Sequence, residues 1–127
     1  MGNKVFGTWT DGTKMIDVNL QIIIFTEDDT HIIFCPALNL TGYGETEAEA
    51  MESFKTVLHE YFTYTNNKDT LAKDLRIMGW EIKKNLKKPA TPPAMSQLLN
   101  TNDDFKKIFD NYDYKKMNTS VSMPVLA

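Results

Sequence analysis

The sequence predicts an α+β fold: a three-stranded antiparallel meander, a crossover helix and a further strand (β-β-β-α-β), followed by an α/β extension. Alternating apolar and polar residues over 15–24, a helix start at Thr46 and apolar residues returning at 80–83 predict it. With 127 residues, 42% hydrophobic, the chain can form one core without metals or disulfides. Four segments are expected: a lead-in (1–14), a core domain (15–83), a Lys/Pro-rich connector (84–94) and a C-terminal helix-strand extension (95–127).

The first two strands are expected to form a hairpin. Ile16, Val18 and Leu20 alternate with polar residues, which is typical of a strand with one buried face. Carboxylates at 27–29 favour a turn because they can bond their own backbone. A second strand follows at 31–35 and ends before proline, which cannot donate a ladder hydrogen bond. Residues 40–44, with two glycines, predict a short, twisted third strand at the edge of the sheet.

A long amphipathic helix is expected after the third strand. Thr46 and Glu49 match a capping box, in which the threonine hydroxyl accepts from the glutamate amide. Apolar residues then recur at three- and four-residue steps, so this helix should pack on the sheet. They are Ala50, Met51, Phe54, Val57, Leu58, Tyr61 and Phe62.

The second half of the chain alternates short helices and strands. Asp69 predicts a helix cap and Gly79 the left-handed residue that closes the helix, before a strand at 80–83 that can lie beside one of the first three. In the extension, residues 95–99 suit one helical turn and Asn102 can cap a helix containing Phe105. Residues 117–125 alternate like a strand, which could close onto the core or pair with a second subunit.

An ordered set of short motifs resembles the HicB-like antitoxins over about residues 15–83. Ile-Ile-Phe-Cys-Pro-Ala-Leu at 32–38 is followed by Gly-Tyr-Gly-Glu-Thr at 42–46 and by Glu49-Ala50 in the amphipathic helix. The resemblance implies a partial ribonuclease H-like fold without nuclease activity. It implies a type II antitoxin that neutralises a small HicA-type toxin, an mRNA-cleaving enzyme, by occluding its RNA-binding surface. Homodimers or larger assemblies are also implied.

Two features depart from that family. After Pro93 the helices come first and the strand last, so no ribbon-helix-helix or helix-turn-helix segment is recognisable and operator binding stays open. The lead-in and the extension lie outside the resemblance. An alternative is therefore an unpaired regulatory or scaffold module of the same fold that binds another protein, a peptide or a small ligand.

The charge distribution suggests where a basic partner would bind. Residues 1–66 carry a net charge of −7 and residues 67–127 a net charge of +4. The candidate partner-binding residues are Glu27, Asp28, Asp29, Glu45 and Glu47. Complementary charge would steer a basic toxin to them, although a polar turn and an acidic helix start also explain these residues. Lys83, Lys84, Lys87 and Lys88 fit a solvated linker better than a phosphate-binding patch.

No catalytic, cofactor or metal residues are predicted, and the chain is not expected to be an enzyme. Cys35 lies in an apolar strand, which favours a core thiol over a nucleophile. His31 and His59 lack the spacing of a metal site. A magnesium-dependent nuclease would place carboxylates on the first strand, main helix and last core strand, where Asp17, Glu52 and Glu81 stand, but each lies off the apolar face and suits a solvated charge.

The expected location is the cytoplasm. Cys35 is the single cysteine, which excludes an intramolecular disulfide. The first residues lack the apolar run of an export signal. The longest apolar stretches, 22–25 and 32–35, are far shorter than the ~20 residues that cross a bilayer. We therefore expect no membrane partner.

Overall fold

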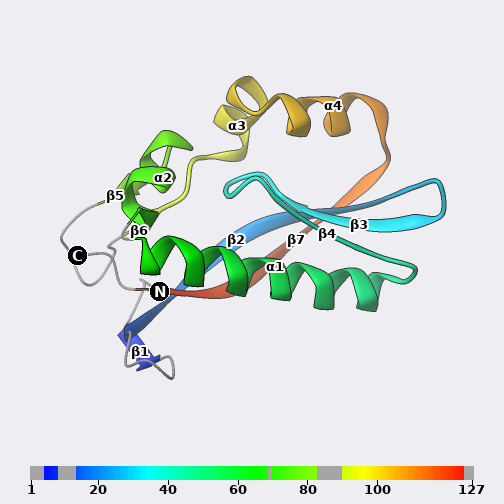
Figure 1. Cartoon of the computed structure of the whole chain (residues 1–127). Coiled ribbons are helices and arrows are strands. Elements are labelled where there is room, and N and C mark those ends of the chain that lie inside the picture. Colours follow the sequence, from blue (N-terminus) through cyan, green and yellow to red (C-terminus); the bar gives the residue numbers. More distant parts are fainter. Residues whose placement is uncertain (1–4, 9–13, 69, 83–89, 125–127) are drawn as a thin grey trace.

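A mixed α+β architecture built on one main antiparallel sheet is seen in the computed structural model (Figure 1). The structure describes residues 5–8, 14–68, 70–82 and 90–124. The main sheet has five strands in the order β1-β2-β3-β4, with β7 also paired to β2. Its strands are β1 (Val5–Thr8), β2 (Lys14–Glu27), β3 (Thr30–Cys35), β4 (Leu40–Gly44) and β7 (Tyr114–Pro124). The other elements are α1 (Glu47–Asn67), α2 (Leu71–Ile77), β5 (Glu81–Ile82), β6 (Ala90–Thr91), α3 (Met95–Thr101) and α4 (Asp103–Asn111).

The antiparallel meander and the crossover helix follow the predicted order, but the last core strand does not. Residues 81–82 form β5, which pairs with β6 in a separate two-stranded sheet. Trp80 explains the difference: its side chain is 4% exposed and its indole Nε1 donates to the carbonyl of Ala37 at 2.7 Å. This hydrogen bond holds the chain under the β3–β4 connection. The main sheet is completed instead by β7, from the C-terminal extension.

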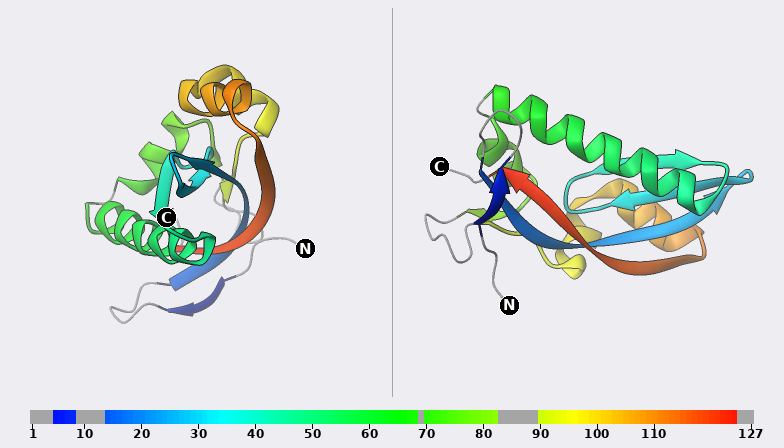
Figure 2. Two further views of the ribbon diagram at one scale, coloured as in Figure 1. Left: turned by 90° about the vertical axis from the view of Figure 1, so that its right-hand side faces the viewer. Right: turned by 90° about the horizontal axis from the view of Figure 1, so that it is seen from below.

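β7 lies against β2 over eleven paired positions, from Met15↔Pro124 to Phe25↔Tyr114. It begins three residues earlier than the alternation at 117–125 suggests, because residues 114–116 continue the same ladder. Of the two arrangements left open by the sequence, the strand takes the one within its own chain. Figure 2 shows β7 crossing beside β2 along the curved sheet.

Helices cover both faces of the sheet (Figure 2). The register places Ile24, Ile33 and Gly42 side by side on the face that α1 covers. Phe25, Ile32 and Tyr43 lie on the opposite face, below α4. β2 therefore buries alternate residues against α1 along its length. Near its C-terminal end, Ile23 and Phe25 are also buried, on the second face. The sequence pattern had indicated one buried face.

The glycines of β4 allow α1 to approach the sheet. A Cβ on Gly42 would lie 2.5 Å from the amide nitrogen of Phe54, and one on Gly44 would lie 2.4 Å from that of Ala50. Neither glycine has a positive φ. Close backbone contact, rather than a twisted edge, is therefore the reason for glycine here.

The predicted caps are largely confirmed. Glu49 N donates to Thr46 Oγ1 at 3.1 Å, and Phe105 N donates to Asn102 Oδ1 at 3.0 Å. Gly79 adopts a φ of 98° after α2. The proposed cap Asp69, residue 83 and most of the connector, residues 84–89, lie outside the described residues, and the connector's Ala90 and Thr91 form β6. None of the described helices combines the length and apolar character needed to span a bilayer.

Candidate partner-binding surface

Two aspartates form the tip of the β2–β3 hairpin. Glu27 pairs with Thr30, so Asp28 and Asp29 are the whole loop. Their φ angles are 50° and 66°, both in the left-handed region that a type I′ turn requires. Such turns favour Asn-Gly, because a side chain with a Cβ is strained there. The hairpin thus has two exposed carboxylates at positions where glycine would adopt the positive φ angle at a lower conformational cost.

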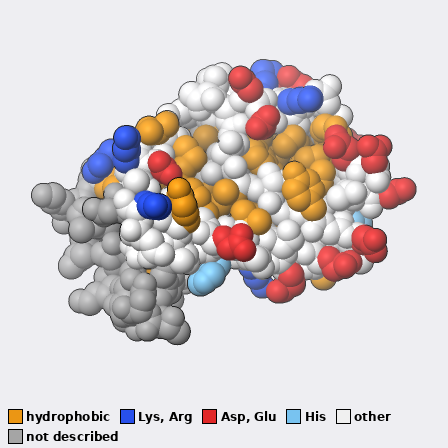
Figure 3. Space-filling view, viewed as in Figure 1, with side chains coloured by type: hydrophobic (Ala, Val, Ile, Leu, Met, Phe, Trp, Pro, Cys, Tyr) orange, Lys and Arg blue, Asp and Glu red, His pale blue; other side chains and the backbone are white. Residues whose placement is uncertain are grey.

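The β4–α1 turn lies at the same end of the molecule as this hairpin tip. His31 pairs with Thr26 on one side and with Gly44 on the other, which brings residue 45 beside the hairpin. Glu45 is exposed. Figure 3 shows Asp and Glu side chains gathered at the end where these turns lie. We call Glu27, Asp28, Asp29, Glu45 and Glu47 the acidic end; the fold brings all five of these predicted residues together.

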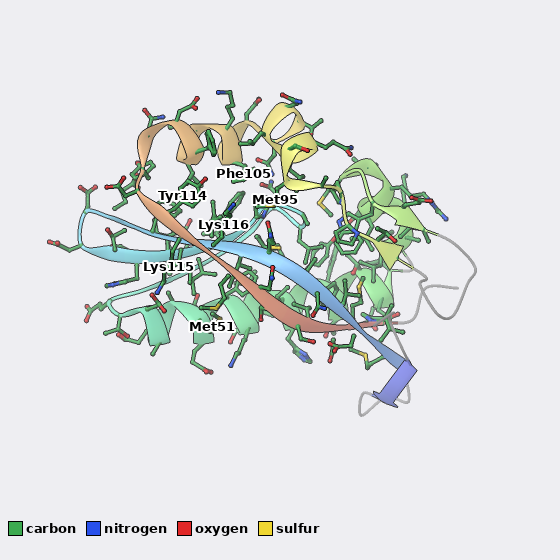
Figure 4. All side chains as sticks on the ribbon, turned by 180° about the vertical axis from the view of Figure 1, so that it is seen from behind. Met51, Met95, Phe105, Tyr114, Lys115 and Lys116 are labelled. Atoms are coloured by element: carbon green, nitrogen blue, oxygen red, sulfur yellow. The ribbon has the colours of Figure 1, made fainter. Side chains whose placement is uncertain are left out.

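Two members of the acidic end are engaged within the chain. Lys115 Nζ lies 2.8 Å from Glu47 Oε1, in an ion pair between β7 and α1. Figure 4 shows Lys115 on β7, above α1. The hydroxyl of Tyr112 donates to the carboxylate of Glu27. Glu47 is therefore a half-buried, neutralised group, and the uncompensated charge lies on the turn residues.

Asp28, Asp29 and Glu45 are the exposed charges of the acidic end. No described lysine, arginine or histidine forms an ion pair with them. Their carboxylates are thus available to a cationic partner, and the field they create is screened only by solvent ions.

A groove beside the acidic end adds apolar surface that the sequence did not indicate. It encloses about 290 Å³ between α4 and the second face of the sheet. Its walls include Phe25, Ile32 and Tyr43 from the sheet and Ile108 from α4, with Glu27 at the acidic side. Tyr43 is 59% exposed. Asp104 and Lys107 of α4 also line it, so the groove combines apolar walls with charged groups, a composition found in protein-binding surfaces.

The candidate nuclease carboxylates do not meet. Asp17 lies on the sheet face opposite the one that α1 covers, since its neighbours Ile16 and Val18 face α1. It accepts a hydrogen bond from the hydroxyl of Ser120. Glu52 is on the exposed side of α1 and forms a 3.6 Å ion pair with Lys55, and Glu81 is in the separate sheet. No cluster of three or more metal-ligating side chains occurs among the residues described.

Cys35 is a core thiol. It is the last residue of β3 and is fully buried in the core, and burial raises its pKa from 9.0 to about 12. The thiol is therefore protonated at neutral pH and unsuited to nucleophilic attack. His31 Nδ1 is buried, and no described group is its hydrogen-bond partner.

The lysine-rich stretch considered as a phosphate contact, residues 83–88, lies outside the described residues. No family model, no curated protein and no solved structure matches this chain.

Proposed function

We propose that this chain is an antitoxin-like binding protein, which neutralises a small basic toxin of the HicA type by covering its RNA-binding surface with the acidic end. The observation that carries the proposal is the hairpin tip, where Asp28 and Asp29 hold left-handed backbone angles that glycine or asparagine would adopt at lower cost. Strain that persists at an exposed site is typical of residues kept for binding.

The mechanism is steric and electrostatic. A toxin that binds RNA must carry cationic side chains that contact phosphates. Asp28, Asp29 and Glu45 present carboxylates in the place of phosphates, and the neighbouring groove around Tyr43 and Ile108 supplies apolar area. Charge complementarity raises the association rate, and the apolar contact slows dissociation. The motifs that resemble HicB-like antitoxins support the same assignment.

The test is inhibition of RNA cleavage. A HicA-type toxin encoded beside this chain is mixed with rising amounts of the protein, and cleavage of a messenger RNA is followed. Wild type is expected to inhibit at one chain per toxin. Asp29→Gly, which removes one charge without straining the turn, is expected to require several-fold more protein.

The matched control is Glu60→Gln. It removes one exposed carboxylate on α1, about 20 Å along the helix from Glu47 at 1.5 Å per residue. It is expected to inhibit like wild type. Equal loss of inhibition in both variants would mean that net charge, not the acidic end, governs binding.

The second candidate function is a regulatory or scaffold module that binds a peptide or a small ligand. It is favoured by a cleft of about 640 Å³ between α2 and the α3–α4 pair. The walls include Ile77 and Met78 from α2, and Ile77 is 74% exposed. A gene that stands alone, and a protein that leaves the toxin's cleavage unchanged, would favour this function over the first.

A further inference from the structure

β7 is an edge strand with one open side. Its other side pairs with β2 from Met15 to Phe25, and no other described strand lies against it. Along an edge strand, every second residue directs its N–H and C=O away from the sheet. Residues 114–124 therefore present a long row of backbone donors and acceptors to solvent.

The opposite edge of the sheet is closed. β4 has five residues, and the backbone N–H of Tyr43 donates to Ser53 Oγ of α1 at 3.2 Å. Gly42 and Gly44 bring the same strand into contact with the α1 backbone. The helix thus covers the β4 edge, the four-residue β1 adds only a short edge on that side, and the eleven-residue β7 is the long edge that can accept another strand.

The middle of β7 has none of the features that usually block strand addition. Soluble proteins protect such edges with inward-pointing charges, proline or bulges. Here Lys115 and Lys116 stand at one end and Pro124 at the other, whereas residues 117–122 read Met-Asn-Thr-Ser-Val-Ser. The ladder to β2 continues through them without a shift of register.

An apolar groove runs beside this open edge. It encloses about 300 Å³ between α1 and residues 119–122 of β7, and Met51, Leu58 and Phe62 are among its walls. Figure 4 shows Met51 on α1 beneath β7. Met117 lies on the same face of the sheet as Val121 and is 39% exposed. The β7 edge therefore has an exposed apolar side chain, Met117, next to a groove that is lined partly by apolar side chains.

We propose that two copies of this chain pair through their β7 strands, antiparallel, about a twofold axis at Thr119. Outward-facing residues must meet outward-facing residues, so the axis passes through a residue rather than between two. Thr119 is the midpoint of Tyr114–Pro124, so this register pairs the whole strand. It joins the two main sheets into one continuous sheet.

The residue pattern of β7 is complementary to itself in this register. Lys116 lies opposite Ser122, and Met117 opposite Val121, where it reaches the groove between α1 and β7 of the other copy. A parallel pairing in register would place each lysine against its own copy, which is destabilising. The antiparallel arrangement separates the lysines and gives an isologous interface.

Sedimentation equilibrium over the micromolar range tests the assembly. Because a single strand pair with two symmetry-related apolar contacts is smaller than a standard interface, we expect a reversible, concentration-dependent dimer. Met117→Lys is expected to raise the dissociation constant at least tenfold. Ile77→Lys is the matched control, since it places the same charge at an apolar residue that is 74% exposed on α2, and it is expected to leave the dimer unchanged.

Disulfide trapping tests the register. At the twofold axis the two Thr119 Cβ atoms are about 5 Å apart, within reach of a disulfide after Thr119→Cys. Ser120→Cys is the control, because two copies of residue 120 are about 8 Å apart in this register. Cys35 is fully buried and does not contribute.

The expected result is rapid oxidation of Thr119→Cys to a covalent dimer and slow oxidation of Ser120→Cys. Faster trapping of Ser120→Cys would overturn the register. A wild-type chain that stays monomeric throughout would overturn self-pairing and would leave the β7 edge to a different chain.

Discussion

At the scale of single residues, the hairpin tip shows a conflict between folding and surface chemistry. Asp28 and Asp29 occupy both central positions of a type I′ turn, with φ angles of 50° and 66°. Left-handed backbone costs a residue with a Cβ about 1 kcal/mol, and glycine avoids that cost. The turn is therefore less stable than its geometry allows, while the carboxylates remain fully presented to solvent.

Asp29→Gly is expected to stabilise the fold by about 0.5–1 kcal/mol while weakening toxin binding. The gain comes from relieved backbone strain and from lower repulsion between adjacent carboxylates. Urea unfolding followed by circular dichroism measures it, with Glu60→Gln as the variant expected to change stability little. A destabilised Asp29→Gly chain would show that the aspartate contributes to folding instead.

Burial of Cys35 makes stability depend on alkaline pH. The unfolded thiol loses its proton near pH 9.0, whereas the folded thiol, with its pKa raised to about 12, keeps it. The stabilisation is therefore complete below pH 9 and is lost as pH rises toward 12, because only the unfolded state releases the proton.

The free energy of unfolding is expected to decline from pH 9 upward and to decline less in Cys35→Ala. Tyr61, whose pKa is raised from 10.0 to about 12 by burial and by the nearby Asp74 carboxylate, adds to the decline above pH 10. Urea titrations between pH 8 and 10 therefore isolate the cysteine. Equal slopes in wild type and Cys35→Ala would contradict its assignment as a buried thiol.

At the scale of elements, one residue, Asn102, joins α4 by hydrogen bonds to the β3–β4 connection, while Phe105 of α4 packs in the core. Asn102 Oδ1 caps the helix, and its Nδ2 donates to the carbonyl of Pro36 at 3.2 Å and to Asn39 Oδ1 at 3.3 Å. The same side chain therefore starts α4 and fixes it to the β3–β4 connection. Pro36, Asn39 and Asn102 also line the cleft of about 640 Å³ between α2 and the α3–α4 pair.

Asn102→Ala is expected to lower the free energy of unfolding by about 1–2 kcal/mol, since it removes an N-cap and two hydrogen bonds to the sheet. Thermal unfolding measures the change. The neighbouring Thr101→Ala removes a hydroxyl that donates to Gln97 within α3 and is expected to cost less than half as much. Equal effects would mean that the contacts to Pro36 and Asn39 contribute nothing.

Local patterns predicted the elements better than their partners. The alternation in β2, the cap at Thr46 and the left-handed Gly79 depend on residues close in sequence, and the structure confirms them. The pairing of β7 with β2 joins residues about a hundred positions apart. No local sequence pattern indicates that β7, rather than the strand predicted at 80–83, joins the main sheet. The hydrogen bond from the Trp80 indole to the distant carbonyl of Ala37 holds the chain that leads into β5 at the β3–β4 connection.

At the scale of the whole molecule, the two charged halves of the chain interleave. Cationic β7 lies beside the acidic first half, and Lys115 neutralises Glu47 across 68 positions of sequence. Sequence position alone predicted that the five carboxylates of the acidic end lie in turns or at a helix start. It could not identify which of them are paired, nor the groove beside Tyr43, since both depend on α4 and β7 folding back.

The middle of the open β7 edge and the exposed turn residues of the acidic end are separate surfaces, and Lys115, at the start of β7, connects the two regions through its ion pair with Glu47. Residues 117–122 carry no charge, whereas the acidic end is formed by two turns at one end of the sheet. In the proposed dimer Asp28 and Asp29 stay accessible, so the proposed antitoxin function predicts two toxin molecules bound per dimer.

Calorimetric titration of the protein with a catalytically inactive HicA-type toxin at two salt concentrations tests directly whether the acidic end binds the toxin. We expect one toxin bound per chain, weaker binding at high salt, and both lower affinity and a smaller salt dependence for Asp28→Asn combined with Asp29→Gly. Binding of the folded variant with wild-type affinity and salt dependence would contradict the assignment of the acidic end as the toxin-binding surface.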